Sequence, residues 1–346
     1  MNVSTLKHAL ASKLWLALLG LAFLVSCSDA PRVIKMQGAT MGTSYHITVY
    51  SKDPRYGKEE IQRRVDTVLE QVNAQMSTYD PESELSKFNQ HYSTEPVVIS
   101  RALERVVSRA IEIADETNGV LDVTVGPLVN LWGFGPQNRP EEVPTQAQLD
   151  EIEAYVGYEK LAINNHQLSK SHPKVYVDLS TIAKGYGVDR VASLLEDLGI
   201  NQYLVEIGGE IVASGGKPDN EPWRLAIEKP VSTERAVQQV VSFNEGALAT
   251  SGDYRNFYVE EGRRYSHIID PETGAPIQHK LVSVSVYAND CMSADAYATA
   301  LMVMGPERAK AFAQQHKLAV MLVFKTDEGF QEFVSPQFEP LLQAKS

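Results

Sequence analysis

The chain has 346 residues, of which 43% are hydrophobic and 22% are charged, and its formal net charge at pH 7 is −12. This is the composition of an ordinary globular protein. Because the chain is acidic and contains no basic stripe, the sequence excludes a nucleic-acid-binding surface.

The first residues are typical of a secretory signal peptide. Lys7 and Lys13 give the segment a basic start, and an apolar run follows from residue 14 to residue 26. A helix that spans a bilayer needs ~20 apolar residues, so this run is too short to be a comfortable transmembrane segment. We therefore expect residues 1–26 to be removed from the mature protein.

The signal peptide ends in Leu-Val-Ser-Cys, which resembles the lipobox of bacterial lipoproteins. The resemblance implies that Cys27 is the lipidated first residue of the mature chain and that residues 27–35 form a short tether. An ordinary signal peptide followed by an incidental cysteine is the alternative. We expect the anchored protein to face the periplasm, with the inner membrane favoured over the outer one.

The remaining cysteine limits how the fold can be stabilised. If Cys27 carries lipid, only Cys291 is left, and no intramolecular disulfide can form. The mature chain also loses two lysines with its signal peptide, so its net charge becomes −14. Stability must therefore come from a hydrophobic core, and the chain is long enough to build one.

In the first half of the chain, strands are followed by helices. Alternating apolar positions predict strands within residues 33–50, and helical periodicity covers residues 58–76 and 100–118. Gly119 is well placed to end the second helix. A loop rich in Gly and Pro is expected at residues 126–140.

The second half mixes the two kinds of element. We expect a short helix at residues 145–156, a strand at 175–178, a helix at 182–198, and short strands with tight turns from 203 to 286. Further helices should begin near Ser293 and near Pro306. Because strands and helices do not alternate regularly, we predict an α+β fold with mixed, largely antiparallel sheets and packed helices. A single large domain should cover residues 36–346.

The start of the helix at 182–198 is unusual in its chemistry. The sequence VDLSTIAKGYGVDR places Asp178, Ser180 and Thr181 before the helix and Lys184 in its first turn. Oxygen side chains at such a position commonly cap a helix. A lysine is unfavourable there, and the two glycines that follow weaken the turn. The alternative is therefore a bound anion, most often a phosphate.

The helix that begins near residue 293 offers two oxygen ligands. Asp295 and Thr299 are four residues apart and so share one helical face. A carboxylate and a hydroxyl can hold a hard cation such as Mg²⁺, which also binds phosphates. An acid in a first helical turn is the simpler interpretation. If the site binds a diphosphate, an acidic protein needs local neutralisation, and a divalent metal is the obvious means.

Several further segments share this polar character, and in order they resemble one known family. They are TMGT, DVTVGPLVNLWGFG, DLSTIAKGYGVDR, GGEI, ATSGDYRNF, HIIDPETG and SADAYATAL. Together they are similar to the ApbE family of FAD:protein FMN transferases, over residues 35–342. The resemblance implies a T-fold-like ApbE architecture.

The resemblance also implies an activity. Members move FMN from FAD onto a Ser or Thr side chain of a target protein, with Mg²⁺, and release AMP. Their targets suggest that the partners of this protein are flavin-carrying subunits of membrane redox complexes of the sodium-pumping NADH:quinone oxidoreductase type. Some members carry a second acid where this chain has Ala298, which leaves the metal coordination number open.

Site residues follow from the resemblance position by position. Asp178 and Lys184 would contact FAD. Thr181, Asp295 and Thr299 would form the metal site. The flavin or adenine pocket would be lined by Met41, Tyr79, Val120, Leu121, Asp122 and Ile269.

The incoming hydroxyl also needs a base. His267 beside Asp270 is our candidate, because imidazole titrates near neutral pH. A histidine that stabilises a turn, and an Asp270 that forms an Asx turn before Pro271, are the alternatives.

Two other functions would use the same residues. One is a metal-dependent FAD pyrophosphatase that gives FMN and AMP. The other is a non-catalytic flavin-binding lipoprotein, which would not need a metal site at Asp295 and Thr299.

Overall fold

The computed structural model describes residues 31–135, 143–231, 236–254 and 256–343. The expected signal peptide, Cys27 and the first residues of the tether, up to residue 30, lie outside these residues. Within the described ranges, no helix combines the length and the apolar character that crossing a membrane requires. The first strand begins at Arg32, so regular structure starts before residue 36.

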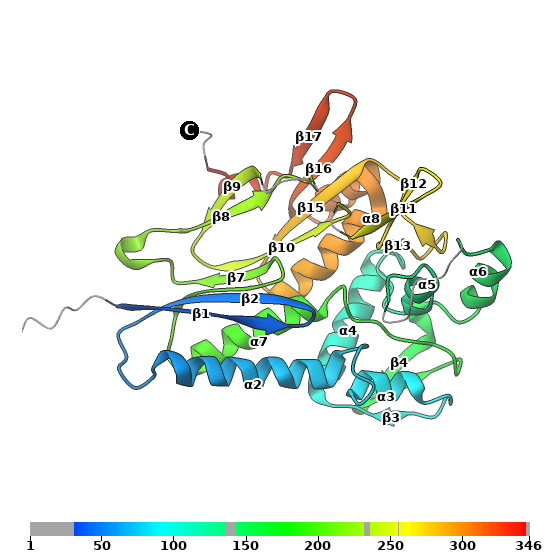
Figure 1. The fold of residues 1–346 in the computed structure, drawn as a ribbon, viewed down its shortest axis with the longest axis horizontal. Helices are drawn as coiled ribbons and strands as arrows, with labels where there is room; N and C mark the ends of the chain where they lie inside the picture. The colour runs from blue at the N-terminus through cyan, green and yellow to red at the C-terminus, as the bar shows by residue number, and fades with distance from the viewer. Residues whose placement is uncertain (1–30, 136–142, 232–235, 255, 344–346) are drawn as a thin grey trace, which may run out of the picture.

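One large antiparallel sheet organises the molecule (Figure 1). Its eight strands follow the order β1-β2-β6-β7-β10-β15-β16-β17, and each neighbouring pair is antiparallel. The strands are β1 (Arg32–Thr40), β2 (Thr43–Ser51), β6 (Gln202–Ile207), β7 (Glu210–Ser214), β10 (Gly246–Gly252), β15 (Leu281–Ala288), β16 (Ala319–Thr326) and β17 (Gly329–Val334).

Three helices pack against one face of this sheet and against one another (Figure 1). They are α2 (Lys58–Met76), α7 (Ala183–Asp197) and α8 (Cys291–Gln315). In α2 the buried residues recur every three or four positions, which is the spacing of a single helical face. In α8 the buried residues between Ala294 and Ala300 are mostly alanines, so this helix can lie close to β10 and β15.

The opposite face of the sheet is covered by a hairpin. Its strands are β8 (Trp223–Glu228) and β9 (Val237–Phe243), and the turn η3 (Glu339–Leu341) packs beside β9. Side chains of this hairpin, such as Trp223 and Val241, pack against Leu248 and Met321 of the sheet. Where the hairpin packs, the sheet is therefore buried on both faces, whereas alternate side chains of β1 remain exposed.

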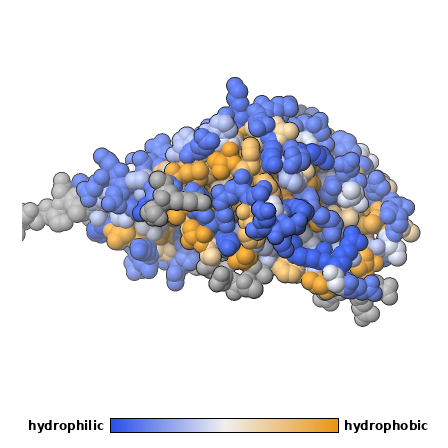
Figure 2. Space-filling view, turned by 90° about the horizontal axis from the view of Figure 1, so that it is seen from above, coloured by the Kyte–Doolittle hydropathy of each residue, from blue (hydrophilic) through white to orange (hydrophobic). Residues whose placement is uncertain are grey.

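Smaller elements build a lobe beside the end of α2 (Figure 1). It contains α3 (Glu84–Gln90), α4 (Arg101–Glu116), α5 (Gly126–Leu131), α6 (Gln146–Glu153), η1 (Tyr158–Lys160), β3 (Val97–Val98), β4 (Leu161–Asn164) and β5 (Gln167–Lys170). The remaining elements are η2 (Pro218–Asn220), β11 (Phe257–Glu260), β12 (Arg263–Ser266), β13 (Ile269–Asp270) and β14 (Ala275–Pro276). The surface seen from above is mostly hydrophilic, with hydrophobic residues exposed between the polar ones (Figure 2).

The predicted fold class is confirmed: the structure is a mixed α+β fold with largely antiparallel sheets. The helices expected at 58–76 and 100–118 are α2 and α4. Ser100 caps α4 by accepting a hydrogen bond from the N–H of Leu103, and Gly119 adopts φ +80° just beyond its end. Thr145 opens α6 with a capping box, also as expected.

The prediction of a strand at residues 175–178 is wrong. Among the described residues the segment pairs with no strand, and buried side chains supply several of its backbone hydrogen bonds. The amide of Asn89 donates to the carbonyl of Val177 at 2.9 Å and accepts from its N–H at 2.8 Å. The ammonium of Lys170 donates to the carbonyl of Val175 at 3.0 Å.

Other predicted boundaries are also corrected. The loop expected at 126–140 begins with the short helix α5. The two helices expected near Ser293 and Pro306 are both present: they are joined end to end as α8, and the backbone leaves helical geometry between them, where Gly305 adopts φ +73° and Pro306 follows. Proline cannot donate the hydrogen bond that an unbroken helix requires, which accounts for the break. Strands β16 and β17 were not predicted.

Candidate active site

Helices α7 and α8 meet very closely at Gly185. A Cβ added to Gly185 would lie 2.6 Å from the carbonyl carbon of Cys291 and 2.9 Å from the Cβ of Asp295, and closer still to the Cys291 carbonyl oxygen. Any other side chain would push the helices apart. The glycine after Lys184 is therefore required by packing, although it weakens the helix itself.

Hydrogen bonds link the two helices in both directions. The N–H of Gly185 donates to Oδ2 of Asp295 at 3.0 Å. Asp189 of α7 accepts hydrogen bonds from the N–H groups of Cys291 and Met292, both at 2.9 Å. Each helix thus satisfies free N–H groups in the first turns of the other, and this fixes the position of Asp295.

A lysine and two carboxylates form the centre of the site. The ammonium of Lys184 lies 2.9 Å from Oε1 of Glu210, the first residue of β7, and 3.5 Å from Oδ1 of Asp295. Both carboxylate side chains are only 4% exposed, whereas that of Lys184 is 30% exposed. The cation is therefore the most exposed member of the cluster.

Burial and mutual attraction have opposite effects on these groups. Burial alone would lower the pKa of Lys184, but the charges of Asp295 and Glu210 raise it above its ordinary value. Burial raises the pKa of both carboxyl groups, and Lys184 opposes that rise. Lys184 therefore remains a cation at neutral pH and can attract a phosphorylated ligand.

Several oxygens around this cluster are available to a cation. Oγ1 of Thr181 and Oε2 of Glu210 are buried and have no hydrogen-bond partner among the described residues. The hydroxyl of Thr299 lies 3.2 Å from that of Ser251, on the adjacent strand β10. These hard oxygen donors fit Mg²⁺ by their chemistry. Within the described ranges, no group of three or more His, Cys, Asp or Glu is arranged to hold a metal, so hydroxyls or backbone oxygens would have to complete a site.

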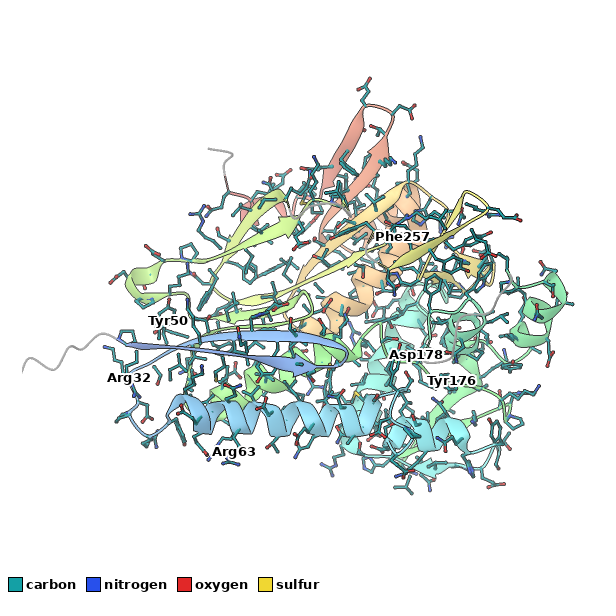
Figure 3. The ribbon with its side chains drawn as sticks, in the orientation of Figure 1. Arg32, Tyr50, Arg63, Tyr176, Asp178 and Phe257 are labelled. Atoms are coloured by element: carbon teal, nitrogen blue, oxygen red, sulfur yellow. The ribbon has the colours of Figure 1, made fainter. Side chains whose placement is uncertain are left out.

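The segment that leads into α7 does not cap the helix with its side chains. The carboxylate of Asp178 accepts hydrogen bonds from the N–H and hydroxyl of Ser180, and the N-cap residue, Ile182, has no capping side chain. Asp178 and Tyr176 lie close together in Figure 3. Burial raises the pKa of both Tyr79 and Tyr176, and the charge of Asp178 adds to this rise. The exposed Tyr79 ring therefore lies near Asp178.

His267 is held with a defined tautomer. Its Nδ1 lies 3.0 Å from the carbonyl oxygen of Asn256. Because a carbonyl only accepts, Nδ1 must carry the proton, and the neutral ring then keeps Nε2 free to accept another. Burial lowers the pKa of His267, Asp253 opposes this, and the positive charge of Lys184 lowers it further. Lys184 therefore lies close enough to His267 for its charge to affect the imidazole.

Asp270 has a different setting from the one expected. Its carboxylate accepts a hydrogen bond from the N–H of Glu272 at 2.9 Å, which is the geometry of an Asx turn. Within the part of the chain that the structure describes, no hydrogen bond or ion pair joins it to His267. Its charge instead acts on His279, together with that of Asp253.

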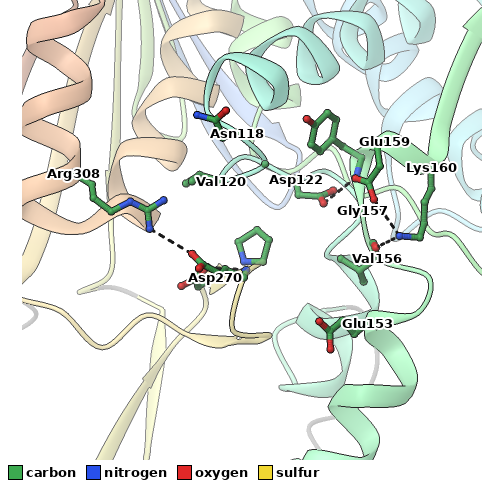
Figure 4. Close-up of a pocket in the computed structure, with 14 residues that line it drawn as sticks. Asn118, Val120, Asp122, Glu153, Val156, Gly157, Glu159, Lys160, Asp270 and Arg308 are labelled. Atoms are coloured by element: carbon green, nitrogen blue, oxygen red, sulfur yellow. Dashed lines mark hydrogen bonds and ion pairs between the residues drawn. The ribbon is translucent and has the colours of Figure 1, made fainter.

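Asp270 lines a pocket of about 430 Å³ (Figure 4). Asn118, Val120, Asp122 and residues 156–160 form the opposite wall, and Arg308 reaches towards Glu272 at 3.6 Å. Five acids but only two bases line this pocket, so a diphosphate is better accommodated beside Lys184.

The other expected pocket residues are buried. Val120 and Leu121 belong to the same hydrophobic core cluster, and Val120 and Asp122 also line the pocket. The carboxylate of Asp122 accepts hydrogen bonds from Thr124 and from the N–H of Tyr158, so it holds the loop together. Ile269 is buried in a cluster around Leu128, Trp132 and Tyr265.

Met41 packs near α7. It has φ +48° and lies so close that a Cβ on Gly187 would be 2.7 Å from its methyl carbon.

Sequence reasoning missed three residues near the site. Glu210 pairs with Lys184, although the GGEI motif was noted without a role for its acid. Asp253 binds Arg264 at 2.5 Å and raises the pKa of His267. Asn89 holds the segment before Asp178. An unusual acid in a strand after two glycines was the available signal for Glu210. Asp253 lies in the ATSGDYRNF motif, which was noted without a role for this acid, and nothing local marked Asn89.

The fold and this geometry define a mixed α+β protein with a buried lysine–carboxylate centre at a helix crossing, a type of site suited to a phosphorylated ligand. The chain belongs to the ApbE family, whose family model matches residues 41–322. A curated relative from Vibrio cholerae, called FAD:protein FMN transferase, is 50% identical over 329 residues, which cover 95% of this chain and 98% of the relative.

Other comparisons agree. A relative of the same name from Haemophilus influenzae is 47% identical over 330 residues, which cover 93% of this chain and 95% of the relative. The solved structure of the flavin transferase ApbE from Vibrio cholerae matches with a TM-score of 0.85 at 50% identity, over 90% of this chain and 100% of that one.

Proposed function

We propose that this protein transfers FMN from FAD to a Ser or Thr side chain of a target protein and releases AMP. Membership of the ApbE family along nearly the whole chain supports this function. The structural observation that carries it is the cluster in which the partly exposed Lys184 lies between the buried Asp295 and Glu210. This cluster offers a cation to a diphosphate and a carboxylate to a metal ion.

The transfer exchanges the phosphoanhydride bond of FAD for a phosphoester bond to the target. The hydroxyl oxygen of the target attacks the phosphorus that carries the riboflavin group, and a new P–O bond forms. The bond from this phosphorus to the bridging oxygen of the diphosphate breaks, and its electron pair leaves with AMP. Such a reaction depends mainly on positioning and charge stabilisation, which Lys184 supplies as a point charge.

His267 takes the proton of the incoming hydroxyl. Its Nδ1 donates to the carbonyl of Asn256, so Nε2 is the acceptor. Burial and the nearby Lys184 favour the neutral ring, which is the form that can act as a base. Asp270, which forms an Asx turn, would contribute to the pocket rather than to the proton transfer.

Asp295, Thr299 and Thr181 would hold Mg²⁺. The orphaned hydroxyl of Thr181 and the long contact between Asp295 and Lys184 support this assignment. When bound, Mg²⁺ supplies positive charge that polarises the diphosphate. A backbone carbonyl or water would complete the coordination where some family members have an acid and this chain has Ala298.

FAD would extend from the Lys184 cluster along the residues that the family resemblance assigns to the FAD pocket. Tyr79 and Asp178 lie near each other close to the N-terminus of α7, and Met41 packs against Gly187. Val120 and Asp122 lie on the wall of the separate pocket that also contains Asp270. Leu121 and Ile269 would support these surfaces from the core.

The protein would act at a membrane. The lipobox-like sequence before Cys27 supports a lipid anchor and a periplasmic location, with the inner membrane favoured. Its targets would be flavin-carrying subunits of membrane redox complexes, such as the sodium-pumping NADH:quinone oxidoreductase.

Product analysis distinguishes this function from its alternatives. The protein is incubated with FAD and Mg²⁺, with and without a target domain, and AMP, free FMN and protein-bound flavin are separated and quantified. A transferase gives AMP and bound flavin only when target is present, and chelation of Mg²⁺ stops both. AMP with free FMN would indicate a pyrophosphatase, and the absence of AMP would indicate a flavin-binding protein.

A further inference from the structure

The site contains a competition between two cations for one carboxylate. Asp295 is within reach of Lys184, yet the proposed function requires Asp295 to bind Mg²⁺. An ammonium and a divalent metal cannot share the same carboxylate oxygen at full strength. Some feature of the site must therefore keep the lysine from closing on Asp295.

Glu210 is placed to do this. The ammonium of Lys184 lies at hydrogen-bond distance from Glu210, 2.9 Å, but at 3.5 Å from Asp295. A charge-assisted hydrogen bond between an ammonium and a carboxylate is normally about 2.7–2.9 Å long. The direct bond is therefore to Glu210, and Oδ1 of Asp295 makes only a long contact.

Glu210 is also rigidly placed. It is 3% exposed and begins β7, which pairs with β6 on one side and β10 on the other. The preceding Gly208 and Gly209 both have positive φ, which allows the tight turn that brings Glu210 to the site. A buried carboxylate is costly unless it is paired, and Lys184 is the ion-pair partner of Glu210.

We propose that Glu210 is a positioning residue that holds the Lys184 ammonium away from Asp295 and so keeps Asp295 available to a divalent cation. This inference rests on the proposed metal site. Without the charge of Glu210, Asp295 becomes the strongest partner of Lys184. The ammonium then closes on Asp295 and competes with the metal.

A double-mutant cycle with Mn²⁺ as the probe tests the proposal without measuring activity. Mn²⁺ prefers the same oxygen ligands as Mg²⁺, and its binding can be followed by electron paramagnetic resonance in the absence of FAD. Glu210→Gln should weaken Mn²⁺ binding about 10–100-fold, the usual loss for groups that orient a metal ligand. Lys184→Gln alone should bind Mn²⁺ at least as tightly as the wild type, since the competitor is gone.

The Mn²⁺ affinity of the double variant, Glu210→Gln with Lys184→Gln, distinguishes a positioning role of Glu210 from direct metal binding. If Glu210 acts only through the lysine, Glu210→Gln should change Mn²⁺ affinity less than about twofold when Lys184 is already replaced. An equal loss in both backgrounds would make Glu210 a direct metal ligand and overturn the proposal. So would an unchanged affinity in the single Glu210→Gln variant, or a loss of binding in Lys184→Gln.

The outcomes also separate this inference from the proposed function. If the wild-type protein transfers flavin and binds Mn²⁺, but the cycle shows no coupling, only the role of Glu210 is refuted. If the wild-type protein shows no saturable Mn²⁺ binding, the metal site itself is refuted and the role of Glu210 with it. Thermal unfolding of each variant shows whether it is folded. If Glu210→Gln does not fold, the Mn²⁺ affinity of Lys184→Gln tests the proposal instead.

Discussion

Gly185→Ala should destabilise the protein and disrupt its site, although alanine is the better helix former. An added Cβ would lie 2.6 Å from the carbonyl carbon of Cys291 and 2.9 Å from the Cβ of Asp295. Both neighbours belong to α8, and neither is the flexible end of a side chain. The helices would have to separate by several tenths of an ångström or more.

Two opposing effects determine how much Gly185→Ala lowers the free energy of unfolding. Overpacking of this kind typically costs about 1–3 kcal/mol, and a clash with backbone belongs at the upper end. Replacing glycine with alanine inside a helix recovers about 1 kcal/mol. The net loss should be about 2 kcal/mol, which lowers the melting temperature of a domain of roughly 310 residues by about 3 °C.

Gly187→Ala, two positions further along α7, is a matched control. Its Cβ would meet the methyl carbon of Met41 at 2.7 Å, and this flexible side chain can move. The same gain in helix propensity should then keep its stability within about 1 kcal/mol of the wild type. Thermal and urea unfolding measure both variants. A Gly185→Ala protein as stable as Gly187→Ala would refute the close helix crossing.

Three further predictions concern the proton acceptor, the buried amide and the anchor. His267→Asn should slow transfer about 10²–10⁴-fold with little change in FAD affinity, whereas joint loss of rate and binding would mark a pocket residue. In the wild type the rate should fall at acid pH, with a midpoint below 6.5, because burial lowers the pKa of His267 and the base must be neutral. Asn89→Leu leaves the N–H and carbonyl of Val177 unpaired in the core and should cost at least ~2 kcal/mol in urea unfolding, unlike Gln90→Ala on the surface of the same helix. Cys27→Ser should release the protein from the membrane fraction or block its processing, whereas Ser28→Ala should not; unchanged fractionation would exclude the lipid anchor.

Elements with strong local signals could be predicted from the sequence. The period of Ile61, Val65 and Leu69 identifies α2, and Ser100 and Gly119 mark the ends of α4 and its connection. These signals act within a few residues, so tertiary contacts do not override them.

Errors occurred where distant residues decide the local structure. The apolar run at 175–178 has the composition of a strand, but Asn89, 88 residues away from Val177, supplies its hydrogen bonds. Propensity cannot distinguish a ladder partner from a side chain that replaces one.

The same limit applies to the site. Lys184 and Asp295 were each singled out by local chemistry, but they are 111 residues apart, and their proximity depends on the crossing at Gly185. Glu210 had no periodic or capping signal, and only its burial beside Lys184 gives it a role. Asp270 appeared to be a partner of His267 because of sequence proximity, yet its carboxylate is turned into an Asx turn.

The intact mass of a target domain is the most direct test of the central claim. A flavin-carrying domain of the sodium-pumping NADH:quinone oxidoreductase type is incubated with this protein, FAD and Mg²⁺, beside a variant whose acceptor Thr or Ser is alanine. The account predicts that the target domain with its native acceptor gains the mass of FMN less one water, and that the alanine variant does not. The native target should gain no mass when the transferase or Mg²⁺ is omitted. A target whose mass is unchanged after AMP has been released, or an alanine variant that gains the same mass, would contradict it.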